Sequence, residues 1–132
     1  AGMAAIFAAG AEGIQMGTRF VSSKESPVHN NFKNKILESG IDGTLVLNKT
    51  SKPVIRALKS KLTHDINQKG QMDMSSMLKI QDLYFKGDME AAPALSGQSS
   101  GLINEIKTVK EIIDETIKEF NIICKKLGYS SF

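Results

Sequence analysis

The chain has 132 residues, of which 41% are hydrophobic and 23% are charged, and its formal net charge is +3. These values are those of an ordinary globular protein, and so small a net charge does not by itself indicate a nucleic-acid-binding protein. No apolar run approaches the roughly 20 residues that a membrane-spanning helix needs, and the lone Cys124 cannot form an internal disulfide, so a cytoplasmic location without a membrane is expected.

The first structural signal is an alanine-rich segment, residues 2–11, which predicts a helix. A short buried strand is predicted over residues 13–16, and it breaks at Gly17 and Thr18. A glycine allows close approach of an anion to the backbone, and a threonine adds a hydroxyl donor. A helix feeding a strand that ends in Gly-Thr is typical of the last unit of a phosphate-binding (β/α)8 barrel. An ordinary turn after a strand is the alternative interpretation.

The middle of the chain is expected to be mostly helical. Helices are predicted over residues 27–37, over residues 53–63 with Pro53 in the first turn, and over residues 72–85. The apolar run at residues 44–47 predicts a strand or an extended segment. His29 and His64 stand alone in the sequence, so no metal site is expected.

The C-terminal part contains one polar loop and one strongly patterned helix. Ser96 and Gln98 lie in a glycine-containing segment that either contacts a ligand or caps a helix starting near Ser99. Thr108 and Glu111 form a capping box, and apolar residues then recur at steps of three and four as far as Leu127. This last helix is predicted to be a packing element, ending at Gly128.

Positive charge is concentrated between residues 49 and 61, which contain five basic residues and no acidic one. A solvated surface is one interpretation of this basic run. A docking patch for an acidic partner, centred on Lys52, Arg56 and Lys59, is the other. Nucleic acid is ranked last, because no aromatic side chain is available for base stacking between Phe32 and Tyr84.

Residues 8–21, AAGAEGIQMGTRFV, resemble the C-terminal part of the flavin-dependent family that contains 2-nitropropane dioxygenases (nitronate monooxygenases) and enoyl-acyl-carrier-protein reductase II. Further matches follow in order at residues 24–33, 53–63 and 87–102, so the resemblance covers most of the chain. The chain departs from the family pattern at residues 47–53 and 92–95. The implied fold class is α/β: the C-terminal portion of a flavin-binding (β/α)8 TIM barrel, mostly helical in the residues present.

The resemblance implies a division of residues 1–132 within one barrel domain. Residues 1–23 would hold helix 7, strand 8 and the phosphate loop, residues 24–95 a helical insertion, and residues 96–132 a returning loop and the last helix. A complete barrel needs about 250 residues. The loops for the flavin ring and the catalytic histidine therefore lie outside this chain, and no catalytic residue is assigned within it. The chain alone is expected to lack activity and bound FMN, and to form a homo-oligomer.

The resemblance also implies the cofactor and its contacts. FMN would be bound by Gln15, Met16, Gly17 and Thr18, with Ser96 and Gln98 near the flavin or the substrate. The reductase interpretation, with NADH or NADPH as electron donor and an enoyl thioester on an acidic carrier protein as substrate, is preferred. The alternatives are a nitronate monooxygenase, which oxidises alkyl nitronates with oxygen, and a helical interaction module without enzymatic activity.

Overall fold

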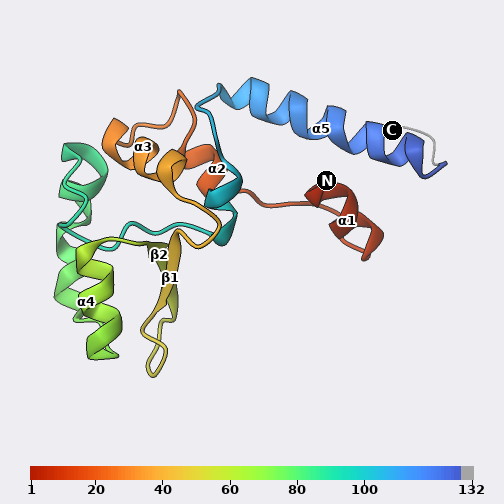
Figure 1. Cartoon of the computed structure of the whole chain (residues 1–132). Coiled ribbons are helices and arrows are strands. Elements are labelled where there is room, and N and C mark those ends of the chain that lie inside the picture. Colours follow the sequence, from red (N-terminus) through yellow and green to blue (C-terminus); the bar gives the residue numbers. More distant parts are fainter. Residues whose placement is uncertain (129–132) are drawn as a thin grey trace.

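The computed structural model describes residues 1–128, apart from the side chains of Met74 and Ser76. The described chain is mostly helical, with one two-stranded sheet. Figure 1 shows a body that contains α2, α3, α4 and the sheet, with α1 and α5 beside it and an extended segment leading from α1 to α2. The elements in chain order are α1 (Gly2–Ala8), α2 (Thr18–Val21), α3 (Asn30–Glu38), β1 (Thr44–Leu47), β2 (Ile55–Leu58), α4 (Lys61–Lys69), the 3₁₀ helix η1 (Met74–Lys79), the π-helix η2 (Asp82–Lys86), the 3₁₀ helix η3 (Gln98–Leu102) and α5 (Val109–Lys126).

Two clusters of buried side chains form the core of the body. The larger one joins α3, β2, η2 and the segments before and after η3, and Phe32 stacks on Tyr84 at its edge with ring centroids 5.5 Å apart. The smaller one lies under the other side of the sheet, between the strands and α4. Their buried members are Phe32, Ile36, Leu58, Leu83, Ala92, Ala94 and Ile103 in the first cluster and Leu47, Ala57, Ile66 and Met72 in the second.

The hairpin β1–β2 corrects the helix that was predicted over residues 53–63. The strand predicted at residues 44–47 is confirmed, and it pairs antiparallel with β2, with Leu47 opposite Ile55. Asn48 organises the turn: its amide donates to the Pro53 carbonyl, and its Oδ1 accepts from Met72 N–H. Asn48 has a φ of 60°, a left-handed conformation that asparagine tolerates well. Strand pairing outweighs the helical spacing here, and the helix begins only at Lys61, capped by Ser60.

The strand predicted at residues 13–16 is not formed. These residues are extended, but no strand among residues 1–128 pairs with them. A strand is stabilised by a neighbouring strand that accepts and donates its backbone hydrogen bonds, and the described chain supplies none at this position. The interpretation as a barrel strand therefore depends on residues beyond this chain.

Three predicted helices differ from the structure, two in their bounds and one in its helix type. The first ends at Ala8 rather than at residue 11, and the helix predicted from residue 27 begins at Asn30, because the side chain of His29 accepts the Asn31 N–H as its N-cap. The helix predicted over residues 72–85 is replaced by η1 and η2. Two features accompany this irregular geometry. The helix η1 contains serines. The chain also passes close to His29 at Gly87, where an added Cβ would lie 2.2 Å from His29 Nδ1.

The C-terminal helix is confirmed with its capping box. Thr108 Oγ1 accepts from Glu111 N–H, and the Glu111 carboxylate accepts from Thr108 N–H, which lowers the pKa of Glu111 below its ordinary value. Glu25 adds a third acceptor for the same turn, since both of its carboxylate oxygens lie 3.0 Å from Val109 N. Phe120 of α5 meets Phe7 of α1 edge to face at 5.2 Å. None of the helices that the structure describes is long and apolar enough to cross a membrane.

Removing the cap hydroxyl of α5 is expected to destabilise the protein. We expect Thr108→Ala to lower the free energy of unfolding by about 1 kcal/mol, because the amide of Glu111 loses its acceptor. Urea unfolding followed by circular dichroism measures this change. The matched control is Thr116→Ala, whose hydroxyl only donates to the Ile112 carbonyl within the same helix, so no comparable loss is expected. Equal losses in both variants would contradict the capping role.

Candidate functional site

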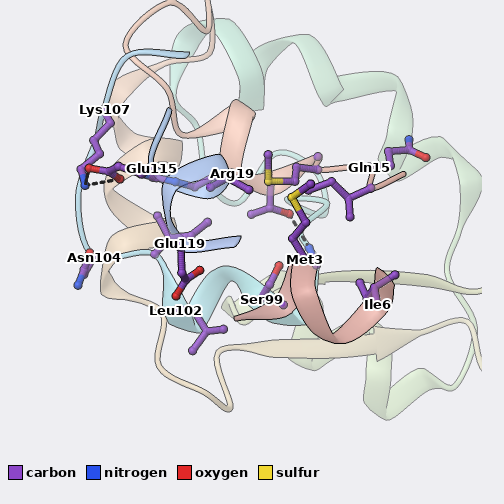
Figure 2. Close-up of a pocket in the computed structure, with 18 of the residues that line it drawn as sticks. Met3, Ile6, Gln15, Arg19, Ser99, Leu102, Asn104, Lys107, Glu115 and Glu119 are labelled. Atoms are coloured by element: carbon purple, nitrogen blue, oxygen red, sulfur yellow. Dashed lines mark hydrogen bonds and ion pairs between the residues drawn. The ribbon is translucent and has the colours of Figure 1, made fainter. Parts of the chain in front are cut away.

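The candidate site is a hollow of about 770 Å³ between α1, α2, η3 and α5 (Figure 2). Residues from four separate parts of the sequence form its wall. The wall includes all four predicted cofactor residues, Gln15, Met16, Gly17 and Thr18, together with Gly2, Met3, Ile6, Ile14, Arg19, Gly97, Ser99, Leu102, Ile103, Asn104, Glu105, Lys107, Glu115, Thr116 and Glu119. The structure therefore brings the predicted phosphate loop and the returning segment around residue 97 to one place.

One end of the hollow offers hydrogen-bond donors around Gly17. No atom outside its chain neighbours lies within 4 Å of the position that a Cβ on Gly17 would occupy. Gly17 is the N-cap of α2, and no side chain caps this helix, so its first backbone amides remain open to a ligand. Thr18 Oγ1 accepts from Gly97 N–H at 2.8 Å, which leaves the hydroxyl proton free to be donated. These groups can hold an anion through donors, without a bound cation.

The other end of the hollow carries paired charges. Lys107 Nζ lies 2.5 Å from carboxylate oxygens of both Glu105 and Glu115, and these hydrogen bonds raise the pKa of Lys107. Arg19 Nη1 donates to the Glu105 backbone carbonyl at 2.8 Å. Figure 2 shows Lys107, Glu115 and Glu119 on one side of the hollow and Gln15 and Ile6 on the opposite side. The donors around Gly17 and Thr18 favour an anion, whereas the carboxylates of Glu105 and Glu115 disfavour one beside them.

The two other predicted site residues do not line this hollow. Ser96 is buried, and its Oγ has no hydrogen-bond partner among the described residues. Gln98 lines a separate hollow of about 300 Å³ next to it. Sequence reasoning missed Ser99 and Leu102, which line both hollows. The glycine-flanked polar segment was the available signal, but the 3₁₀ geometry of η3 decided which of its side chains points where.

The basic run lies on the hairpin and at the start of α4, away from the hollow. Lys49 and Lys52 belong to the hairpin turn, Arg56 to β2 and Lys61 to the first turn of α4. Arg56 Nη1 donates to Thr44 Oγ1 at 2.9 Å, and Lys59 lines a small groove that also contains Lys35. Within residues 1–128, none of these five side chains forms an ion pair, whereas Lys24, Lys86, Lys107 and Lys110 all do.

The sequence and its structure are similar to those of known proteins. The profile of the nitronate monooxygenase family matches residues 1–119. A probable nitronate monooxygenase of Staphylococcus saprophyticus is 27% identical over 133 residues, which cover 95% of this chain and 37% of that protein. An octahydroindene carboxyl-CoA dehydrogenase of Mycobacterium tuberculosis is 23% identical over 160 residues, covering 88% of this chain and 45% of that protein.

A solved structure is also similar to this chain. FabK from Thermotoga maritima superposes with a TM-score of 0.88 at 39% sequence identity, over 96% of this chain and 42% of that protein. The chain thus spans less than half the length of each of these relatives. The family profile covers nearly the whole of the sequence, and the similarity includes the loop that forms the hollow. The chain therefore belongs to the nitronate monooxygenase family.

Proposed function

We propose that this chain forms the phosphate end of an FMN site in an oxidoreductase of the enoyl-acyl-carrier-protein reductase II type. The observation that carries the proposal is the meeting of Gly17 and Thr18 with Gly97 across an open hollow. The similarity to FabK at 39% identity supports the reductase branch, and the resemblance of residues 8–21 to the family supports the position of the phosphate loop.

The residues present fit the phosphate group of FMN. The open space over Gly17 permits close approach to the backbone, the uncapped start of α2 offers amide donors, and the Thr18 hydroxyl adds another. The volume of about 770 Å³ lies within the range of ordinary ligand pockets. When bound, FMN would transfer a hydride between a nicotinamide cofactor and the substrate. The residues of this chain would bind and orient it.

The rest of the proposed enzyme lies in sequence that this chain does not contain. A (β/α)8 barrel needs about 250 residues, and residues 13–16 lack the neighbouring strands that a barrel would supply. We assign the flavin-ring contacts and the catalytic residues to that sequence. The 132-residue chain by itself is expected to be inactive and to form an oligomer through its apolar surfaces.

A nitronate monooxygenase is the second candidate function. The matching family profile and the Staphylococcus saprophyticus relative both carry this name. The phosphate end of the hollow would serve this reaction equally well, since it binds the cofactor and not the substrate. The choice between the two reactions therefore depends on which substrate is turned over.

Blocking the anion end of the hollow should weaken FMN binding. We expect Gly17→Val, in the complete enzyme, to reduce FMN affinity at least about tenfold, a loss of about 1.4 kcal/mol, because its side chain would occupy the approach to the α2 amides. Fluorescence titration of the apoenzyme with FMN measures the affinity. The matched control is Gly13→Val, which also has open space around its Cβ position but does not line the hollow. Equal FMN affinities in the Gly17→Val variant and the unaltered enzyme would contradict the assignment.

Substrate turnover by the same complete enzyme distinguishes the proposed functions. The reductase predicts NADH or NADPH oxidation that depends on an added enoyl thioester, with a flavin absorption spectrum in the purified protein. The nitronate monooxygenase predicts oxygen uptake on addition of an alkyl nitronate. Absence of flavin together with absence of both activities would favour the helical interaction module.

We further propose that the basic run receives an acidic carrier protein. Its cations have no ion-pair partner among the described residues, so they can pair with a partner's carboxylates without first breaking an internal ion pair. Lys52 and Lys59 stand at opposite ends of the strand β2, which gives the patch the length of the hairpin.

Charge changes in this patch should affect only the carrier-linked substrate. We expect the triple variant Lys52→Glu, Arg56→Gln, Lys59→Glu to raise the KM for an acyl-carrier-linked substrate several-fold, and to leave the KM for the coenzyme A analogue nearly unchanged. High salt should have the same selective effect, because it screens exposed charges. Lys118→Glu with Lys126→Glu on α5 is the control. An equal response of both substrates would identify the run as a solvated surface.

A further inference from the structure

We propose that Arg19 is a positioning residue for the anion-binding end of the main hollow. It would hold Gly17 and Thr18 in place for a phosphate group without contacting that group itself. This inference rests on the proposed function, because the phosphate is that of FMN.

The side chains of Thr18 and Arg19 fasten this end of the hollow on two sides. Thr18 Oγ1 accepts from Gly97 N–H at 2.8 Å, and Arg19 Nη1 donates to the Glu105 carbonyl at 2.8 Å. The two contacts span 79 and 86 positions of sequence, and both their donors and their acceptors belong to residues that line the main hollow. Two neighbouring residues therefore tie the phosphate loop to two different parts of the wall.

Few other contacts fix the start of α2. The segment before it, residues 13–16, has no partner strand in the described chain, and none of the four residues of α2 is buried. So short a helix is not stable by itself. Val21, at its end, packs against the larger core cluster, whereas Gly17 and Thr18 at its start depend on the two tethers. Loss of the Arg19 tether should therefore displace the phosphate donors and leave the core in place.

The guanidinium of Arg19 has no competing ion pair. Glu105, Glu115 and Glu119 all line the main hollow, yet none of them forms an ion pair with Arg19 within residues 1–128. Lys107 binds Glu105 and Glu115 instead. Figure 2 shows Arg19 next to Glu115, and these two residues also line a smaller hollow together. Arg19 thus holds a backbone position, through a donor that stays charged at all ordinary pH values, and does not neutralise a carboxylate.

Comparison of FMN with riboflavin tests this role, because riboflavin lacks the phosphate. Apoenzyme of the complete protein is titrated with each flavin, and fluorescence gives both affinities for the unaltered protein, for Arg19→Met and for Arg19→Lys. We expect Arg19→Met to lower the FMN affinity about tenfold, the size typical of a hydrogen bond from a charged group, and to leave the riboflavin affinity nearly unchanged. Arg19→Lys should lower the FMN affinity about threefold, because its ammonium remains a donor but ends short of the position of Nη1.

Lys24→Met is the matched control. Lys24 joins the same two parts of the chain, since it pairs with Glu111 at 3.9 Å, but it does not line the main hollow. The ratio of the FMN affinity to the riboflavin affinity should stay unchanged in this variant. Equal losses of both affinities in Arg19→Met would show that Arg19 supports the fold as a whole, and an unchanged ratio would show that the phosphate donors do not depend on it. Either result overturns the proposal, and if Arg19→Met does not fold, Arg19→Lys decides by the same two criteria.

Failure of the proposed function has a different signature. A complete protein that binds neither flavin, or that binds FMN and riboflavin equally well, would refute the phosphate site itself. A protein that prefers FMN, with a preference of the same size in Arg19→Met, would refute only the positioning role of Arg19.

Discussion

The structure depends on contacts between two short segments, residues 18–25 and residues 97–109, which close the long stretch of chain between them into a loop. Residues 18–25 bind residues 97–109 through backbone and side-chain hydrogen bonds: Gly97 N–H donates to Thr18, Arg19 donates to the Glu105 carbonyl, Lys24 N–H donates to the Lys107 carbonyl, and Val109 N–H donates to Glu25. The side-chain contacts among them join residues 79, 86 and 84 positions apart. Closing a loop of about 80 residues costs roughly 4 kcal/mol of entropy beyond a constant, and four hydrogen bonds contribute about 1 kcal/mol each. The free energy of this loop closure is thus close to zero, and the closed loop is stabilised by the buried core formed between the two segments.

The candidate site is a consequence of this closure. Thr18 lies at the junction, where its hydroxyl both accepts from Gly97 and borders the hollow. The charged groups that fix the start of α5 form the opposite wall, so the contacts that hold the helix also shape the site. Under the proposed function, Thr18 would contribute both to the stability of the fold and to the binding of an anion. Gly17 does not take part in the closure, which makes it the cleaner position for separating the two roles.

The cations of the chain differ in whether they form ion pairs. Lys24 and Lys107, which lie where residues 18–25 meet residues 97–109, form ion pairs with carboxylates. Their charges therefore help to hold these two segments and α5 together. The basic run on the hairpin and at the start of α4 forms no ion pair within the described part of the chain. The basic run is therefore one stretch of the described chain in which five cations without an ion pair follow one another closely in sequence.

Local chemistry in the sequence determined the elements whose stabilising contacts are short-range. The capping box of Thr108 and Glu111 and the helix that follows it could be predicted, because each depends on neighbours a few residues away. The apolar stripe of α5 was visible too, but the structure buries only Ile112 and Phe120 of it and leaves Ile113, Ile117 and Leu127 exposed. The extended run at residues 44–47 was predicted from its apolar residues, without its partner strand. The Gly-Thr segment was also visible, and the family was identified from residues 8–21 together with the matches at residues 24–33, 53–63 and 87–102. Tertiary structure decided the rest. Residues 55–58 form a strand because β1 is available to pair with them. Residues 13–16 form none, because the described chain contains no partner strand for them. Ser99, and not Gln98, lines the main hollow, because the turn of η3 sets the direction of each side chain. Strand pairing and the direction of a side chain toward a distant wall are long-range properties, and a single sequence read along its length does not contain them.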